Sequence, residues 1–194
     1  AILLVLAISG ARPGVADAVT DWNAVAGGVA PRFGGPQQQS RAMAIVQIAV
    51  HDALNAIEPR YKSYTGPATA DPDASPDAAV AAAASQTLLT MLYLLPDSPP
   101  RTAAIAAVVA AFNAAVGPEP YDEATQAGID AGTSAAASIL ALRAEDGSDT
   151  PHLPYTLEPA PGIYQPTPNP EFPAVITPSF AGWALVTPFA LVHA

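Results

Sequence analysis

Residues 41–64 read Arg-Ala-Met-Ala-Ile-Val-Gln-Ile-Ala-Val-His-Asp-Ala-Leu-Asn-Ala-Ile-Glu-Pro-Arg-Tyr-Lys-Ser-Tyr, and this stretch decides the fold. At about 100° per residue its aliphatic side chains share one arc, which is typical of a helix face turned to a core. The arc holds Ile45, Val46, Ala49, Val50, Ala53 and Ile57. The opposite edge is a stripe of Ala44, Gln47, His51, Asn55 and Glu58. We expect this helix to start at an N-cap at Ser40 and to run to about Glu58, because Pro59 cannot continue it.

Three more helices are expected downstream, each with its own start or stop signal. Ser75-Pro76-Asp77 combines a cap, a first-turn proline and an acid, and Ser98-Pro99-Pro100 repeats the first two features. Helical spacing of apolar residues then predicts helices over about 76–95, about 99–116 and from Glu119 or Tyr121 to about Glu145. We therefore predict an all-α fold with about four helices in a bundle over residues 40–147.

Two flanking segments differ in composition from the bundle. Residues 19–39 contain two glycine pairs and two prolines, which predict a linker-like leading segment without regular structure. Residues 148–194 contain ten prolines interleaved with aromatic residues. Since aromatic side chains seek a surface to bury against, we expect an extended segment packed on the helices, with Trp183 and Phe189 as anchors. It ends at Ala194 directly after an apolar run, so we interpret it as cut short.

In the last expected helix, Gly128, Gly132 and Ala136 fall four residues apart and leave a smooth stripe. In a membrane such spacing is typical of helix dimerisation. In an alanine-rich helix of a globular domain we instead expect tight packing of two helices within the domain.

Residues 1–18 begin with the apolar run Ala1 to Ile8 and reach a small-residue site at Ala16-Asp17-Ala18. This is typical of a secretory signal peptide whose basic start is truncated, and the alternative is a short hydrophobic helix packed on the domain. We predict an exported protein, periplasmic or extracellular, that begins near Val19 when mature. The sequence has no cysteine, so this exported domain would manage without disulfides.

The formal net charge of -10 excludes a basic footprint for nucleic acid or for anionic membranes. The mean hydropathy is positive, but alanine is by far the commonest of the apolar residues. The window 78–95 carries Ser85, Gln86, Thr87 and Thr90 instead of a run of large aliphatic residues. We therefore expect a soluble protein without a membrane span and no nucleic-acid partner.

The cluster of His51, Asp52, Asn55 and Glu58 is the one group of residues in the sequence that is a candidate for a catalytic or metal site. A metal would need three or four converging ligands, and no second histidine follows His51 at the fourth position. General acid or base work by His51 is possible chemistry, but a helix-surface histidine bonded to a neighbouring segment is the favoured interpretation. Two more histidines, His152 and His193, stand in the proline-rich region without local partners.

Nucleophile and phosphate-loop signatures are absent from the sequence. The single lysine, Lys62, stands with Arg60, Tyr61 and Tyr64 in one slightly basic patch. An anion site there is an alternative to a solvated loop, which we favour. We predict no catalytic, cofactor-binding or metal residues in this chain.

Several motifs resemble a known family. The pieces are Asp21-Trp22-Asn23, the helix Arg41 to Ile57 with its exit Tyr61-Lys62-Ser63-Tyr64, and the later run from Pro161 to Pro168 followed by Pro178, Trp183 and Thr187-Pro188-Phe189. Together they look like the N-terminal half of bacterial vanadium-dependent haloperoxidase-like proteins, of the type 2 phosphatidic acid phosphatase superfamily. The resemblance spans nearly all of residues 21 to 192 and implies helices followed by a proline-rich crossing to a second helical bundle.

The resemblance also implies three catalytic motifs that hold vanadate or phosphate. They are a Lys with an Arg-Pro some residues on, a Pro-Ser-Gly-His, and a Ser-Arg that leads to Gly-x-His. Lys62 is not followed by Arg-Pro, Pro178-Ser179 continues into Phe180-Ala181 instead of Gly-His, and Ser40-Arg41 leads to no Gly-x-His. The oxyanion-binding set is therefore expected beyond Ala194, and no cofactor is expected in this chain; vanadate would belong to the complete haloperoxidase.

The favoured hypothesis is an exported N-terminal helical portion of a haloperoxidase or acid phosphatase relative, inactive alone. Its expected partner is the C-terminal helical half or a second copy. The alternative is a non-catalytic secreted helical interaction domain.

Overall fold

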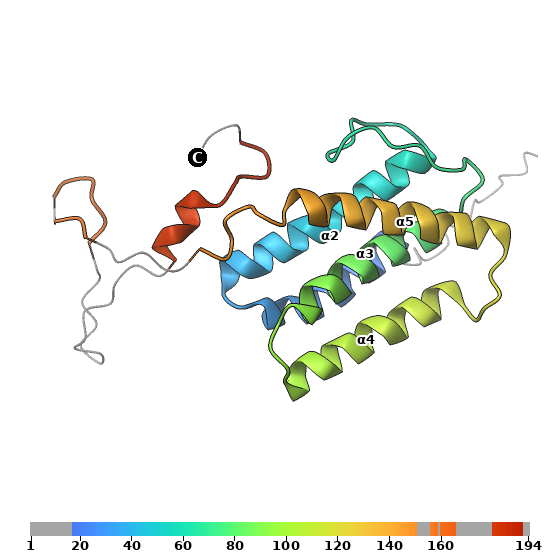
Figure 1. The fold of residues 1–194 in the computed structure, drawn as a ribbon, viewed down its shortest axis with the longest axis horizontal. Coiled ribbons are helices and arrows are strands. Elements are labelled where there is room, and N and C mark those ends of the chain that lie inside the picture. Colours follow the sequence, from blue (N-terminus) through green and yellow to red (C-terminus); the bar gives the residue numbers. More distant parts are fainter. Residues whose placement is uncertain (1–16, 151–155, 159, 166–179, 192–194) are drawn as a thin grey trace, which may run out of the picture.

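The computed structural model describes residues 17–150, 156–158, 160–165 and 180–191, and within them every regular element is helical. Five α-helices and two short 3-10 helices follow one another along the chain (Figure 1). They are α1 (Ala18–Val29), η1 (Ala30–Phe33), α2 (Pro36–Ile57), α3 (Pro76–Tyr93), α4 (Pro99–Val116), α5 (Glu123–Leu142) and η2 (Ala181–Leu185). The prediction of an all-α fold is confirmed.

The middle of the bundle is α3, which contacts all four other α-helices. Its first half is almost entirely alanine and is buried from Ala78 to Ser85. Small side chains let neighbouring helices approach on several sides, so a helix without a narrow apolar face can serve as the centre. Its buried hydroxyls are satisfied locally, since Thr87 donates to the carbonyls of Ala83 and Ala84.

α5 approaches α3 closely along the small-residue stripe of α5. A methyl group added at Gly132 would lie 2.7 Å from the backbone nitrogen of Ala83 and 2.8 Å from the Cβ of Ala82. At Gly128 it would overlap the carbonyl oxygen of Ser75. The prediction that this stripe packs two helices within one domain is confirmed.

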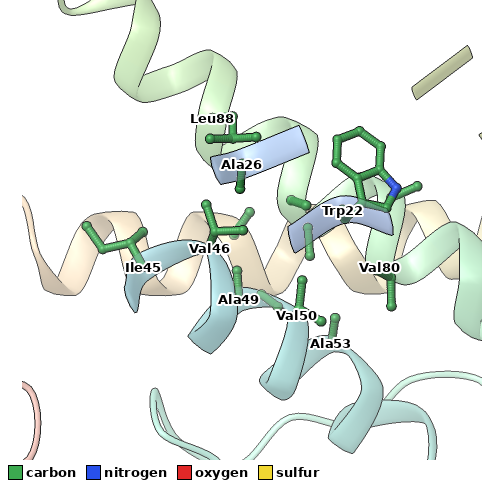
Figure 2. Close-up of a cluster of buried hydrophobic side chains, with 14 of the residues drawn as sticks. Trp22, Ala26, Ile45, Val46, Ala49, Val50, Ala53, Val80 and Leu88 are labelled. Carbon is green, nitrogen blue, oxygen red and sulfur yellow. The ribbon is translucent and has the colours of Figure 1, made fainter. Parts of the chain in front are cut away.

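The aliphatic arc of α2 forms the second part of the core (Figure 2). Five of its six predicted members are fully buried, and Ile57 packs against the edge of the cluster. Opposite them lie Trp22 and Ala26 of α1, with Val80 and Leu88 of α3 closing the cluster. Side chains from three helices thus bury the arc that the sequence pattern indicated.

The prediction of an unstructured leading segment over residues 19–39 is wrong. Residues 18–29 form α1, capped by the carboxylate of Asp17, which accepts a hydrogen bond from the backbone of Thr20 at 2.8 Å. Gly27 and Gly28 are helical and have open space where a side chain would stand, while Trp22 is only 4% exposed. Burial of the indole outweighs the low helix propensity of the glycine pair, roughly 1 kcal/mol per glycine.

The predicted start of the second helix is also wrong. α2 begins at Pro36 after an N-cap at Gly35, and Ser40 lies inside it, where its hydroxyl donates to the carbonyl of Pro36. Proline suits a first helical position, because its fixed φ is helical and its missing N–H is not needed there. The bundle therefore begins at residue 18 and not at residue 40.

Other helix ends agree with the sequence signals. Ser75 and Ser98 cap α3 and α4, and Gly117 ends α4 with a positive φ of 77°. The helix expected from Glu119 or Tyr121 to about Glu145 is shorter, running from Glu123 to Leu142 with Asp122 as its cap.

α4 lies at the edge of the bundle and buries one residue, Val108. By length and composition it is the one helix in the described part of the chain that could cross a membrane. A single helix of this kind is weak support for a membrane protein, so the expectation of no span stays a prediction.

The proline-rich segment over residues 148–194 is partly described, by residues 148–150, 156–158, 160–165 and 180–191. Of its expected anchors, Phe189 packs against the core, whereas Trp183 is half-buried within the turn of η2. The predicted signal peptide lies almost wholly outside the described residues and stays a prediction.

Candidate functional site

Asn55 is the centre of the contacts between α2 and the loop that follows it. Its amide nitrogen donates to the carbonyl of Tyr61 at 2.9 Å and to the hydroxyl of Ser63 at 3.1 Å. Its amide oxygen accepts from the backbone nitrogens of Arg60 and Tyr61 at 2.9 and 2.8 Å. One side chain, 7% exposed, therefore satisfies four groups of a loop that has no regular hydrogen bonding of its own.

Asp52 holds the next part of the same loop. Its two carboxylate oxygens accept from the backbone nitrogens of Tyr64 and Thr65 and from the hydroxyl of Thr65, all within 2.8 Å. The carboxylate is 4% exposed, and three donors compensate for the loss of water around a buried charge. Asp52 is thus a structural carboxylate for the loop.

The other stripe residues also contact neighbouring chain. His51 Nε2 lies 3.3 Å from the carbonyl of Lys62, and Gln47 donates to the side chain of Asn23 in α1. Glu58 pairs with Arg60 through both carboxylate oxygens at 2.7 Å. The interpretation of His51 as a histidine bonded to a neighbouring segment is therefore confirmed.

A pocket of about 600 Å³ opens where the end of α2 meets this loop and the start of α3. Its walls are mainly apolar, and among its polar residues Asn55, Glu58 and Arg60 make hydrogen bonds within the α2 end and its loop. The lining residues are His51, Leu54, Asn55, Ile57, Glu58, Arg60, Tyr61, Pro72, Ala74 and Pro76. The residues that line this pocket include no serine or cysteine.

The patch around Lys62 is less basic than its sequence suggests, because the charge of Arg60 is paired with Glu58. That pairing raises the pKa of Arg60, mainly through the hydrogen bond to Glu58. A free guanidinium fork is what an anion site needs, so the solvated-loop interpretation is favoured. His152 and His193 lie outside the described residues.

Metal ligands do not gather in the part of the chain that the structure describes, where no group of three His, Cys, Asp or Glu residues could hold an ion. The expectation of no metal, cofactor or catalytic residue therefore stays a prediction.

A buried ionic cluster that the sequence interpretation missed lies at the opposite end of α2. Asp146 accepts from Arg41 at 2.7 Å and from Arg143 at 3.0 Å, and its side chain is 2% exposed. Arg143 is 3% exposed. Burial raises the pKa of Asp146, but hydrogen bonds from Arg41 and Ser148 outweigh it and bring the pKa below its ordinary value.

No local signal could have revealed this cluster, because Arg41 and Asp146 are 105 residues apart in sequence. A cation is favourable near the end of a helix, which accounts for the position of Arg143 but not for its burial.

Comparison with known proteins identifies the scaffold. The family described as "Vanadium chloroperoxidase N-terminal domain" matches residues 16–181, which covers all five α-helices and the proline-rich segment up to the start of η2. Comparisons with curated proteins and with solved structures gave no significant match. By its helices and by this match, the chain belongs to the family of vanadium chloroperoxidase N-terminal domains.

Proposed function

We propose that this chain is the helical scaffold portion of an exported vanadium haloperoxidase or acid phosphatase relative and has no catalytic activity alone. The observation that carries the proposal is the use of the polar side chains of α2. The side chains of Asp52 and Asn55 form hydrogen bonds with the loop after α2, and none of their acceptor or donor groups faces the pocket unpaired.

The ion pairing of arginines in the bundle supports the same proposal. An oxyanion such as vanadate or phosphate needs several cationic or hydrogen-bonding groups aimed at one point. Three arginines of the bundle are engaged elsewhere, with Arg41 and Arg143 on Asp146 and Arg101 on Asp97. The motifs that would hold the oxyanion in a haloperoxidase or phosphatase do not occur in the chain.

The purified chain tests the proposal directly. We expect no bromide oxidation with vanadate and hydrogen peroxide, no turnover of a phosphomonoester, and no binding of vanadate in titration calorimetry. A vanadium chloroperoxidase assayed in parallel gives the positive signal. Turnover above the background of heat-denatured chain would overturn the proposal, and loss of that turnover in His51→Ala would then assign it to the α2 stripe.

We propose further that α4 faces the partner, either a C-terminal helical half or a second copy. Arg101 is the one charged residue between Pro99 and Val116, and Val109 is 39% exposed. An uncharged helix face is typical of a surface that becomes covered. Sedimentation velocity over a range of concentrations tests the second copy: we expect Val109→Glu to reduce any association, whereas Asn113→Glu at the end of the helix leaves more of it intact.

The proposal of export rests on the sequence of residues 1–18. Expression of the chain in a bacterium, with a methionine and a basic start restored before Ala1, followed by fractionation and N-terminal sequencing, tests it. Recovery of an uncleaved chain from the cytoplasm would contradict export and favour the alternative of a short hydrophobic helix that remains on the domain.

A further inference from the structure

Residues 180–191, which we call the strap, cross the end of the bundle where α2 begins and α5 ends (Figure 1). The strap has no charged side chain of its own. Its first residue, Phe180, lies on the N-cap of α2, where a Cβ added at Gly35 would be 2.6 Å from the phenyl ring. Glycine at this position therefore makes room for the strap.

The middle of the strap is bound through its backbone. The nitrogen of Thr187 donates to the carbonyl of Asp146 at 2.8 Å. The guanidinium of Arg143 donates to the carbonyls of Thr187 and Pro188. A planar guanidinium presents several donors in a fixed fork, so two successive carbonyls can share it.

The last anchor is Phe189, which is held from two sides. Its ring centre lies 3.9 Å from the guanidinium carbon of Arg143. Its carbonyl accepts from the hydroxyl of Tyr64 at 2.8 Å. Since Tyr64 belongs to the loop that Asp52 holds, the strap bridges the α5 end of the bundle and the α2 loop.

Asp146 organises these contacts although its own carboxylate does not touch the strap. The carboxylate accepts from Arg41 Nε, Arg143 Nε and the backbone of Ser148. Arg41 also donates to the carbonyl of Arg143. The buried guanidinium of Arg143 is thus oriented by Asp146 on one side and presented to the strap on the other.

The helices do not depend on the strap to the same degree. The core between α1, α2, α3 and α5 is made of apolar side chains and close helix approaches, with Phe189 as a partly buried addition from the strap. Proteins open locally in cooperative units, and a segment attached mainly by polar contacts opens at a lower free energy than an apolar core.

We propose that the strap is a separable latch, which opens as one unit when the Arg143–Asp146 pair is broken while the five helices remain folded. The latch stands apart from the proposed function, because it needs no catalytic partner. Where the proposed function also holds, the latch sets how firmly the chain that leaves residue 191 is attached to the helical scaffold.

Hydrogen–deuterium exchange with mass spectrometry on Asp146→Asn tests the latch. The variant keeps the size of the side chain and removes its charge, so Arg143 loses the partner that orients it. We expect exchange in peptides covering residues 180–191 to accelerate about tenfold or more, because charge-assisted hydrogen bonds are lost. Peptides from α3 should change by less than about twofold.

Asp149→Asn is the matched control, since Asp149 is an exposed aspartate in the same turn. A second variant, Tyr64→Phe, removes one hydrogen bond to the strap and leaves the ionic cluster intact. It should accelerate strap exchange about threefold, and it keeps the test valid if Asp146→Asn does not fold.

Three outcomes would overturn the latch. The first is strap exchange in Asp146→Asn no faster than in Asp149→Asn. The second is acceleration of α3 by the same factor as the strap, which would show that the helices and the strap open together. The third is an unchanged strap in Tyr64→Phe. Each readout is independent of peroxidase or phosphatase activity, so failure of the latch is distinguishable from failure of the proposed function.

Discussion

Gly132 of α5 lies so close to Ala83 of α3 that a single added methyl group would sit 2.7 Å from the backbone nitrogen of Ala83. This distance is far inside van der Waals contact, and the atoms opposite belong to a buried helix. The packing of the two helices therefore depends on the absence of a side chain at this position.

Gly132→Ala should destabilise the domain by about 1–3 kcal/mol, because overpacking forces the two helices apart and outweighs the higher helix propensity of alanine. Urea denaturation followed by circular dichroism measures the change. Gly27→Ala in α1 is the control, since open space surrounds Gly27, and it should stabilise the domain by roughly 0.5–1 kcal/mol. Equal effects of the two substitutions would contradict the close approach.

Asn55→Ala should cost about 1–3 kcal/mol, because it leaves loop groups of residues 60–63 without their partner in a partly buried place. Exchange of the amides of Arg60 and Tyr61 should accelerate as well. Gln47→Ala, which removes one exposed hydrogen bond to Asn23, should cost under about 0.5 kcal/mol. A stability loss without faster exchange of the loop amides would argue against Asn55 as the organiser of the loop.

The charge of Asp146 should make stability depend on pH in the acid range. The pKa of Asp146 in the folded chain lies below its ordinary value of 3.8, so the folded state favours the ionised form. The stabilising contribution is fully present above the unfolded pKa and disappears as the pH falls through the lowered folded pKa. Free energies of unfolding measured from pH 6 down to about pH 2 should fall less steeply for Asp146→Asn than for the natural chain. Parallel slopes for the two proteins would refute the prediction, and Asp130→Asn serves as an exposed control.

Ser75→Ala and Ser98→Ala test the bundle through the same chemical change. Each serine caps a helix with one bond of 3.3 Å to the third residue along. Ser75→Ala removes only this cap, since the backbone N–H that donates to Ala124 of α5 remains, and it should cost about 1 kcal/mol. The loss at Ser98 should be smaller, because α4 lies at the edge of the bundle. A larger effect at Ser98 would mean that α4 carries more of the stability than its burial indicates.

The sequence was sufficient where a helix is defined by its own residues. The arc from Ile45 to Ala53 and the caps Ser75 and Ser98 are local signals, and the structure has them where they were expected. α1 was missed because its glycine pair resembles a break, while its stability comes from Trp22 packing on residues far along the chain. The Arg41–Asp146 contact could not be foreseen, since neither residue has a distinctive neighbourhood in sequence.

In the candidate site, too, the local pattern could be predicted from the sequence, whereas the contacts with other segments could not. The stripe on α2 was found by periodicity, but its role was open because the partners of Asn55 are backbone groups of an irregular loop. Backbone donors and acceptors are the same for nearly every residue type, so the sequence cannot indicate where they converge.

If the predicted leader peptide is removed by a protease, the N-cap of α1 makes the position of the cut important. Asp17 places a carboxylate at the positive end of α1, and its hydrogen bond to Thr20 lowers its pKa and keeps it ionised. A protease that cut after Ala18 would replace that carboxylate with a free ammonium group, the wrong charge for the start of a helix. Cleavage before Asp17 would leave the helix intact. The protein that begins at Asp17 and the one that begins at Val19 are therefore different molecules in their first turn, and the one that keeps the aspartate starts with a capped helix.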